Sequence, residues 1–483
     1  MRDHLLLYIN GRRQQVAAND GFLSLSDFLR LRLGQTGTKI VCSEGDCGSC
    51  TVLIGRPNAD RFDYRPVDSC IQWMFQLDGT HIVTVEGLAG GKCEITPVQD
   101  AMIRCHGSQC GFCTPGFVVA MTGLLEVSHS PTDEDWRFGL TGNLCRCTGY
   151  IPIVDAGRSL DAGAVTRLNE LYPAATMLRE LAKTAHDPLS VVAQQSGGLR
   201  RFFSPTTLDE ALRILNDHPT AKVVAGATDV GVQLNKGVID PDVFLDLNRV
   251  NELMGAAIES SAGGDAIVTG ARTTWTEIEA IARDTLPEFH EIVSIFGSPQ
   301  IRHVGTIGGN IVNASPIADS LPFLFVAEAE LELASSAGTR TVPVESFYLG
   351  YKKLDLKPGE LLTRVRIPLP EASDLLRLVK VSRRRDLDIA TFTAAIWMRL
   401  DGETIADARI AFGACGPTVI RARRTEDFLR GQPFDEDTMR TAGDVAVSEI
   451  SPISDVRGSA DFRYQLTRNV LVKFYLEQAL AAV

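Results

Sequence analysis

The sequence predicts a multidomain α+β protein, and three observations predict it. Its 483 residues amount to roughly three domains of ordinary size. Ten of the eleven cysteines lie in the first 147 residues, which sets the amino-terminal third apart. From Ser204 onward, short β-rich runs alternate with capped helices. The expected segments are 1–90, 91–165, 166–197, 198–374 and 375–483.

Composition limits the class of protein further. Apolar residues make up 45% and charged residues 22%, as in ordinary globular chains. The formal net charge of −12, without a basic tail, argues against nucleic acid or an anionic membrane as the main partner. No apolar run approaches the roughly 18 residues of a membrane span, and no export signal opens the chain. We therefore expect a soluble cytoplasmic protein.

The first segment, 1–90, is expected to form a small mixed sheet packed on one helix. Asn10-Gly11 favours a tight hairpin turn. An amphipathic helix is expected over Ser24–Leu33, with Gly34 placed to end it. The expected strands are His4–Asn10, Arg12–Ala17, Thr51–Ile54 and Ile82–Glu86.

The second segment, 91–165, predicts a small helical bundle. Thr96-Pro97 with Gln99 supplies an N-cap, a first-turn proline and a capping-box partner. Thr114-Pro115 supplies a second N-cap with a first-turn proline. Residues 166–197 lack a sustained hydrophobic period and are expected to be a linker. The expected helices lie near 97–106, 115–128, 133–140 and 151–165.

The remaining two segments are expected to be α+β. Thr207 and Glu210 form a helix start signal ahead of an apolar helical face. Near residue 375 a basic stretch and then a strand-like run, Ile389–Leu400, indicate a C-terminal subdomain. The dense basic run from Arg377 to Arg385 is expected to be a solvated face.

The first cysteine set has a spacing typical of iron–sulfur proteins. Cys42, Cys47 and Cys50 follow the C-x4-C-x2-C pattern of plant-type 2Fe-2S ligation, and Cys70 supplies a fourth thiolate. Gly45 and Gly48 leave room for backbone N–H groups to approach the sulfurs. The alternative, a structural zinc site, usually has two short paired spacings, so the pattern favours 2Fe-2S.

A second set of four, Cys110, Cys113, Cys145 and Cys147, lies at expected helix ends. Its spacing alone leaves both a 2Fe-2S cluster and zinc open. The other cysteines, Cys93, Cys105 and Cys415, are expected to be small buried hydrophobes.

Two glycine-containing loops could together cradle a pyrophosphate. One runs from the strand-like Lys222–Val224 to Gly231, and the other is Gly305–Asn310. Glycine lets backbone N–H groups approach a phosphate, although each loop alone is equally well explained as a tight turn. No nucleophile elbow, zinc-protease or Walker motif occurs, so no catalytic residue is assigned. His106 and His303 are interpreted as ordinary polar residues.

Six motifs in this order resemble the small, iron–sulfur and FAD-binding subunit of the bacterial xanthine dehydrogenases, in the molybdenum hydroxylase family. The resemblance covers almost the whole chain. The motifs are CSEGDCGSC (42–50), SQCGFCTPGF (108–117), GNLCRCTGY (142–150), VVAGATDVG (223–231), HVGTIGGNIVNASPIAD (303–319) and KVSRRRDLDIA (380–390).

The resemblance implies a β-grasp plant-type ferredoxin domain, a helical-bundle 2Fe-2S domain, and a vanillyl-alcohol-oxidase-like FAD domain with an α+β C-terminal subdomain. It implies one 2Fe-2S cluster on each cysteine set, with Cys42, Cys47, Cys50, Cys70, Cys110, Cys113, Cys145 and Cys147 as ligands. It places FAD contacts at Val223, Val224, Ala225, Gly226, Ala227, Thr228, Asp229, Val230, Phe296, Thr306, Ile307, Gly308, Gly309, Asn310, Asp319, Leu362 and Lys380.

The resemblance also implies an electron-transfer role within a xanthine dehydrogenase. Electrons from hypoxanthine or xanthine oxidation to urate, on a molybdopterin-binding large subunit, would pass through the Cys110 set and the Cys42 set to FAD and then NAD. Two small and two large subunits would form a heterotetramer. Gln109 would face the molybdenum cofactor and Tyr351 would neighbour the nicotinamide, while Leu387 departs from an acidic residue of the relatives and weakens the case for NAD.

Two other functions stay open at this point. A related molybdenum hydroxylase would act on aldehydes, carbon monoxide or aromatic-CoA substrates. A protein of another class would be a zinc-stabilised binding scaffold without a redox role.

Overall fold

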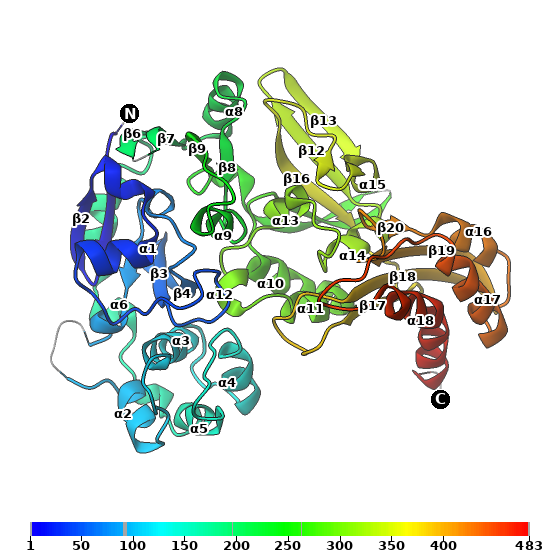
Figure 1. Ribbon diagram of the computed structural model, residues 1–483, viewed down its shortest axis with the longest axis horizontal. Coiled ribbons are helices and arrows are strands. Elements are labelled where there is room, and N and C mark those ends of the chain that lie inside the picture. Colours follow the sequence, from blue (N-terminus) through cyan, green and yellow to red (C-terminus); the bar gives the residue numbers. More distant parts are fainter. Residues whose placement is uncertain (1, 90–93, 196, 262, 482–483) are drawn as a thin grey trace. The chain divides into compact units, whose positions relative to one another are not determined.

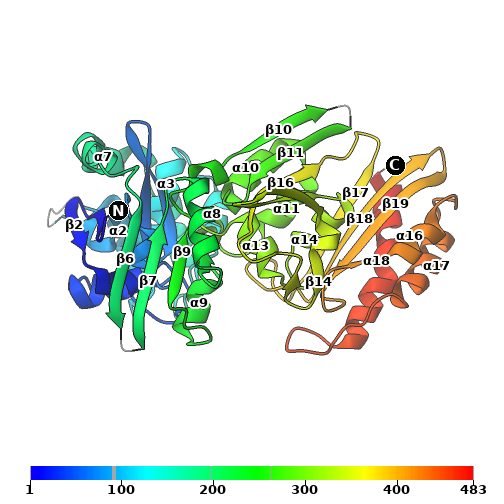
Figure 2. The same ribbon diagram turned by 90° about the horizontal axis from the view of Figure 1, so that it is seen from above.

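The computed structural model describes residues 2–89, 94–195, 197–261 and 263–481 (Figures 1 and 2). The chain divides into two compact units. The first comprises Met1–Glu252 with Ser298–Gly305, and the second comprises Leu253–Gly297 with Thr306–Val483. Cys93 lies outside the described residues.

A five-stranded mixed sheet opens the first unit, as the sequence predicts. Its order is β2-β1-β5-β3-β4, with β1 antiparallel to β2 and parallel to β5. The β3–β4 hairpin contains a strand that was not predicted, because Pro66 within β4 argues against a ladder position. The strands are β1 (Leu5–Ile9), β2 (Arg12–Val16), β3 (Thr51–Asn58), β4 (Arg61–Asp68) and β5 (His81–Val83).

The helix expected over Ser24–Leu33 forms, but as two short turns. Ser24 caps α1 (Leu25–Asp27) by accepting a hydrogen bond from the Asp27 N–H group, and a π-helical turn follows at Phe28–Arg32. Leu25 and Phe28 are buried beneath the sheet. Short 3-10 helices in the chain lie at Ala18–Phe22, Met74–Gln76, Val85–Gly87, Ala162–Ala164 and Asn251–Leu253.

The helical bundle also forms where it is expected. Thr96 and Gln99 make the predicted capping box, whereas the Thr114 hydroxyl donates to the Ser108 hydroxyl instead of capping its helix. The last helix ends at Arg158, seven residues earlier than expected. The bundle consists of α2 (Pro97–Arg104), α3 (Thr114–Val127), α4 (Asp133–Gly139) and α5 (Ile151–Arg158).

Residues 166–197, expected as a linker, contain regular structure. Each helix here is short, so its apolar period spans few turns, yet Leu168, Met177 and Leu181 are buried against the bundle and the first sheet. The segment holds α6 (Leu168–Leu171), α7 (Ala174–Ala182) and β6 (Leu189–Gln195).

A second sheet completes the first unit in the order β6-β7-β9-β8. Phe202 of β7 meets Phe22 edge-on, with ring centroids 5.4 Å apart, so this sheet packs on the first one. Helix α12 (Pro299–Arg302) returns to this unit from later in the chain and packs on β4. The other elements are β7 (Gly198–Ser204), α8 (Leu208–Asp217), β8 (Lys222–Val224), α9 (Val230–Asn235) and β9 (Val243–Asp246).

The second unit begins with an antiparallel sheet in the order β10-β11-β16-β12-β13. Its inner face packs on helices around Trp275, Phe289 and Phe323, which are buried. The elements are β10 (Ala256–Ser261), β11 (Gly264–Gly270), α10 (Trp275–Thr285), α11 (Pro287–Ser294), α13 (Ile307–Asn313), α14 (Leu321–Val326), β12 (Glu330–Ser335), β13 (Gly338–Pro343), α15 (Val344–Phe347), β14 (Tyr348–Gly350), β15 (Lys353–Leu354) and β16 (Leu361–Pro368).

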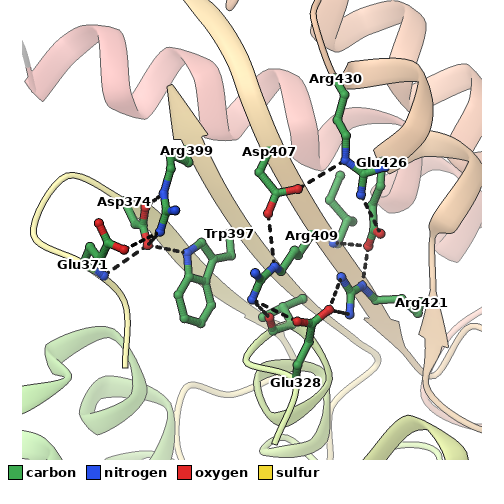
Figure 3. Close-up of polar contacts among 12 residues, drawn as sticks. Glu328, Glu371, Asp374, Trp397, Arg399, Asp407, Arg409, Arg421, Glu426 and Arg430 are labelled. Atoms are coloured by element: carbon green, nitrogen blue, oxygen red, sulfur yellow. Dashed lines mark hydrogen bonds and ion pairs between the residues drawn. The ribbon is translucent and has the colours of Figure 1, made fainter. Parts of the chain in front are cut away.

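The C-terminal part forms the expected α+β subdomain, a sheet in the order β17-β18-β19-β20 covered by three helices. Ion pairs line this sheet (Figure 3). Buried Arg421 pairs with buried Glu426 and reaches Glu328, while Asp374 accepts a hydrogen bond from the Trp397 indole at 2.9 Å. The elements are β17 (Leu375–Val381), β18 (Phe392–Asp401), β19 (Thr404–Gly413), β20 (Ile420–Arg421), α16 (Arg423–Leu429), α17 (Glu436–Val447) and α18 (Ala460–Ala481).

Candidate redox and flavin sites

The first cysteine set gathers around the loop that precedes β3. Cys47, Cys50 and Cys70 are buried and Cys42 is half-buried. Ser43, Gly45 and Gly48 have left-handed φ angles of 54°, 70° and 65°, which wrap the chain around the thiols. The Cys42 sulfur is in hydrogen-bonding contact with the thiols of Cys47 and Cys70, and Cys70 also contacts Cys50. All four predicted ligands are therefore together.

Contacts among these thiols shift the pKa values of Cys42 and Cys47 in opposite directions. Hydrogen bonds from the other thiols lower the pKa of Cys42, and the same contact raises the pKa of Cys47. The Glu44 N–H group also donates to the Cys42 sulfur, at 3.4 Å. Burial raises the pKa of Asp68, which accepts from the Cys50 thiol at 3.7 Å, to about 7. Cys42 is thus the thiol that this site favours as a thiolate.

The second cysteine set lies at the amino-terminal ends of α3 and α5. Its contacts join the two segments in pairs, Cys110 with Cys147 and Cys113 with Cys145. Cys110 and Cys147 are exposed, whereas Cys145 is buried. Burial raises the pKa of Cys113 to about 12, while the N–H group of Phe112 lowers the pKa of Cys110.

The donor chemistry of both sets fits 2Fe-2S clusters. Such a cluster spreads four thiolates over two irons, so it needs cysteines arranged in pairs. The Cys110–Cys147 and Cys113–Cys145 pairs match that need, and each brings together both segments of the set. In the described part of the chain, no three His, Cys, Asp or Glu side chains gather where a single ion could bind them all.

Cys105 and Cys415 lie away from both sets. Cys415 is fully buried beside Thr467, as expected for a small hydrophobe. Cys105 is only partly buried, near Ser159, because α2 ends there.

The first flavin loop, Ala225–Asp229, connects β8 with α9 in the first unit. Side-chain amides hold its carbonyls: Gln76 and Asn248 donate to Ala225, each at 2.8 Å, and Gln72 donates to Gly226 at 3.0 Å. A Cβ atom on Gly226 would lie 1.9 Å from the Val304 carbonyl oxygen, so only glycine fits. This close contact joins the loop to the segment that leads into the second loop.

The second flavin loop begins α13 in the second unit. Thr306 caps the helix by accepting from the Gly309 N–H group at 3.1 Å. A Cβ atom on Gly308 would meet the Ala271 carbonyl oxygen at 2.6 Å, whereas one on Gly309 would meet only the Thr306 hydroxyl. The Gly309 backbone is therefore open on that side, as close approach of a ligand requires.

A buried ion pair follows this loop. Lys380 Nζ lies 2.8 Å from Asp319 Oδ2, and their side chains are 2% and 7% exposed. Burial raises the pKa of Asp319, and Lys380 opposes that shift. Asp319 Oδ1 has no hydrogen-bond partner among the described residues. A buried oxygen without a hydrogen-bond donor can accept a hydrogen bond from a polar group of a bound ligand, so these residues are compatible with FAD.

Three further predicted flavin residues, Phe296, Asn310 and Leu362, lie in the second unit. Leu362 is buried in β16, and Phe296 meets Trp275 edge-on with centroids 5.0 Å apart. Asn310 accepts from the Ser320 hydroxyl at 2.7 Å. Val223–Val230 lie in the first unit.

Several carboxamides of these sites were not predicted. Gln72, Gln76 and Asn248 hold the first flavin loop, and Asn143 and Gln300 join the cysteine segments. Asn143 lies within the motif GNLCRCTGY, but its type and position alone do not show what it contacts. His303, interpreted as an ordinary polar residue, is buried, and its Nδ1 donates to the Pro66 carbonyl at 2.8 Å.

Four family descriptions match the chain in succession. They are "2Fe-2S iron-sulfur cluster binding domain" over 7–69, "[2Fe-2S] binding domain" over 84–158, "FAD binding domain in molybdopterin dehydrogenase" over 193–370, and "CO dehydrogenase flavoprotein C-terminal domain" over 377–478. The first two name 2Fe-2S, not zinc, for the two cysteine-containing regions.

Curated relatives align with nearly the whole chain. Xanthine dehydrogenase 1 of Arabidopsis thaliana is 31% identical over 98% of this chain, and aldehyde oxidase 1 of Macaca fascicularis is 31% identical over the same share. Each alignment covers 39% of the relative, so the chain spans about two fifths of their length.

Solved structures resemble more than half of the chain. A carbon monoxide dehydrogenase chain of Hydrogenophaga pseudoflava is 30% identical with a TM-score of 0.53, covering 56% of this chain and 94% of that one. A quinoline 2-oxidoreductase chain of Pseudomonas putida 86 is 32% identical with a TM-score of 0.52, covering 58% and 96%. None of the helices in the described part of the chain has both the length and the apolar character of a bilayer span.

Proposed function

The chain belongs to the molybdenum hydroxylase family, whose iron–sulfur and FAD-binding domains it carries, and we propose that it is the electron-transfer subunit of a xanthine dehydrogenase. The observation that carries the proposal is the pairing of thiols in two cysteine sets on one chain with an FAD-binding domain. A cytoplasmic location belongs to the same proposal, because eight ligand thiols need a reducing compartment.

The bound groups supply redox chemistry that amino acids lack. Iron–sulfur clusters accept and release single electrons, and FAD exchanges them for the electron pairs of a hydride acceptor. The chain's own residues hold and orient these groups. In our proposal the thiolates named above hold the clusters, and the loops at Gly226 and Gly309, with Asp319 and Lys380, hold FAD.

A molybdopterin-binding large subunit is the proposed partner, and the exposed end of the bundle is its proposed docking face. Cys110 and Cys147 are exposed there, and the apolar side chains of Phe112, Tyr150 and Ile151 are 48%, 41% and 69% exposed around them. An apolar rim around exposed thiols favours a protein partner. A heterotetramer of two small and two large subunits is part of the proposal.

NAD is the proposed electron acceptor. The resemblance implies a nicotinamide site near the loop between β17 and β18, in which Arg384 pairs with Asp388 and Leu387 has a φ of 70°. Formation of NADH by the purified complex, compared with reduction of oxygen, tests this part separately.

The complex, purified with its large subunit, provides the main test. We expect about four irons per small subunit, bound FAD and two distinct 2Fe-2S paramagnetic signals after reduction. Turnover of hypoxanthine is expected. A colourless protein that binds zinc, or one without flavin, would contradict the proposal.

A related molybdenum hydroxylase is the second candidate. Relatives named aldehyde oxidase reach 31% identity, and the similar solved structures are named for carbon monoxide and quinoline. Activity on aldehydes, carbon monoxide or aromatic-CoA substrates, with none on hypoxanthine, would favour this candidate.

A further inference from the structure

The backbones of the two cysteine sets are in direct contact. The Leu144 N–H group donates to the Cys47 carbonyl at 3.0 Å, and Leu144 directly precedes Cys145. Gly116, near the start of α3, packs so closely on Gly48 that a Cβ atom would lie 2.2 Å from the Gly48 carbonyl oxygen. One hydrogen bond therefore links a residue of the first set with the neighbour of a residue of the second.

Asn143 reinforces this contact with its side chain. The side chain is buried, and its Nδ2 donates to the Gly48 carbonyl at 2.9 Å. The same carbonyl accepts from the N–H group of Thr51 at 3.1 Å and from its hydroxyl at 2.6 Å. Gly48 lies between two ligands of the first set and has a left-handed φ of 65°. Asn143 thus holds the loop of the first set from a position two residues before Cys145.

Gln300 fixes the orientation of that carboxamide. It lies on α12, is fully buried, and its Nε2 donates to Asn143 Oδ1 at 2.8 Å. A Cβ atom on Gly142 would lie 1.9 Å from Gln300 Oε1, so the glycine makes room for the glutamine. Gln300 belongs to the region that matches the FAD-binding domain. Its partner, Asn143, belongs to the segment of the second cysteine set and contacts the loop of the first.

The contacts of Asn143 are buried hydrogen bonds, unlike the apolar packing that usually joins domains. In the Asn143 carboxamide, Nδ2 donates to the Gly48 carbonyl and, at 3.3 Å, to the Thr51 hydroxyl, and Oδ1 accepts from Gln300. Loss of the Gln300 carboxamide would leave the buried Asn143 Oδ1 without its donor, and loss of the Asn143 carboxamide would remove the side-chain bond from the second set to the Gly48 carbonyl. In the second case the Leu144 N–H bond to the Cys47 carbonyl would remain.

We propose that Asn143 and Gln300 are positioning residues that hold the Cys42 set and the Cys110 set at one fixed spacing. The inference rests on the proposed function, because it requires a cluster on each set. It assigns a role at the iron–sulfur sites to a residue from the flavin part of the sequence.

The magnetic interaction between the two reduced clusters reports this spacing. In the wild-type complex at low temperature, we expect two paramagnetic signals with a mutual splitting. Asn143→Ala is expected to keep about four irons and both signals but to lose or change the splitting. Asn169→Ala is the matched control, because Asn169 also joins distant segments, donating to the Phe62 carbonyl at 2.9 Å, without touching a cysteine set. The control is expected to keep the wild-type splitting.

Gln300→Met provides the second, decisive variant. Methionine keeps the volume beside Gly142 but cannot donate to Asn143, so the splitting is again expected to change. If Asn143→Ala loses iron, this variant decides the question. Loss of iron in both variants, or an unchanged splitting and unchanged reduction potentials in both, would overturn the positioning role. Two signals without mutual interaction in the wild type would also overturn it. A wild type without two 2Fe-2S signals would instead refute the proposed function.

Discussion

At the scale of single residues, the thiols of each set are distinguished by their neighbours. Cys42 receives hydrogen bonds that lower its pKa, while Cys47 is buried and donates. Cysteine ligates metals as the thiolate, so the contacts around Cys42 favour the ionised form that the proposed first cluster requires.

Cys47→Ser is expected to remove one cluster and leave the other. The second set has its own four ligands, so iron should fall from about four to about two atoms and one paramagnetic signal should remain. Iron analysis and electron paramagnetic resonance of the reduced protein measure this. Cys105→Ser, outside both sets, should keep both signals. Loss of both clusters in Cys47→Ser would show that the sites are not independent.

His303 makes stability depend on pH. Burial lowers its pKa to about 3, against about 6.5 in an unfolded chain. Between these values the unfolded chain binds more protons, so the free energy of unfolding falls as the pH falls from about 6.5 towards 3. His303→Asn can keep a donor for the Pro66 carbonyl and should lower the slope by up to about 1.4 kcal/mol per pH unit.

Urea unfolding of wild type and variant at several pH values between 5 and 7.5 tests this expectation. Exposed His186→Asn, which removes an imidazole that is not buried, is the control. Burial also lowers the pKa of His81, to about 4, so part of the slope should persist in His303→Asn. Equal slopes in the wild type and His303→Asn would contradict the assignment.

At the scale of elements, the two flavin-loop glycines have different surroundings. Gly226 is enclosed by the Val304 carbonyl, so any side chain there would disrupt the first unit. Gly309 would meet only the Thr306 hydroxyl. Gly309→Val should therefore fold with both clusters but fail to bind FAD, because the side chain blocks approach to the backbone. Flavin absorbance and released FAD measure the loss, and normal FAD content would refute this loop assignment.

Sequence signals that act over a few residues predict helix starts, but they do not predict contacts between distant segments. The capping pairs Thr96 with Gln99 and Thr207 with Glu210 mark real helix starts, because caps act within one turn. The sequence analysis does not predict strand β4. This strand contains Pro66, a residue that disfavours strands, and in the structure Pro66 lies opposite Leu53 in the β3–β4 hairpin. The cysteine spacing predicted the sets, but not the Asn143–Gln300 bond, whose partners are 157 residues apart.

At the scale of the whole molecule, the chain exposes apolar side chains next to the second cysteine set. Phe112 and Ile151, both next to the second cysteine set, are 48% and 69% exposed. Burying a fully exposed side chain of this kind stabilises by about 1.5–3 kcal/mol, and an interface that covered the exposed part of Phe112 and Ile151 would contribute a corresponding fraction. The proposed large subunit would provide that burial and would also cover Cys110 and Cys147.

Phe112→Asp combined with Ile151→Asp is therefore expected to abolish copurification of the large subunit, because a docked face would bury two unpaired carboxylates. The small subunit should keep about four irons and its FAD, since neither side chain is a ligand. Ile453→Asp, a substitution of an equally exposed side chain in the C-terminal subdomain, should keep the complex. Affinity purification with molybdenum and iron analysis measures both variants. A complex that survives the double substitution would place the large subunit on another face of this chain.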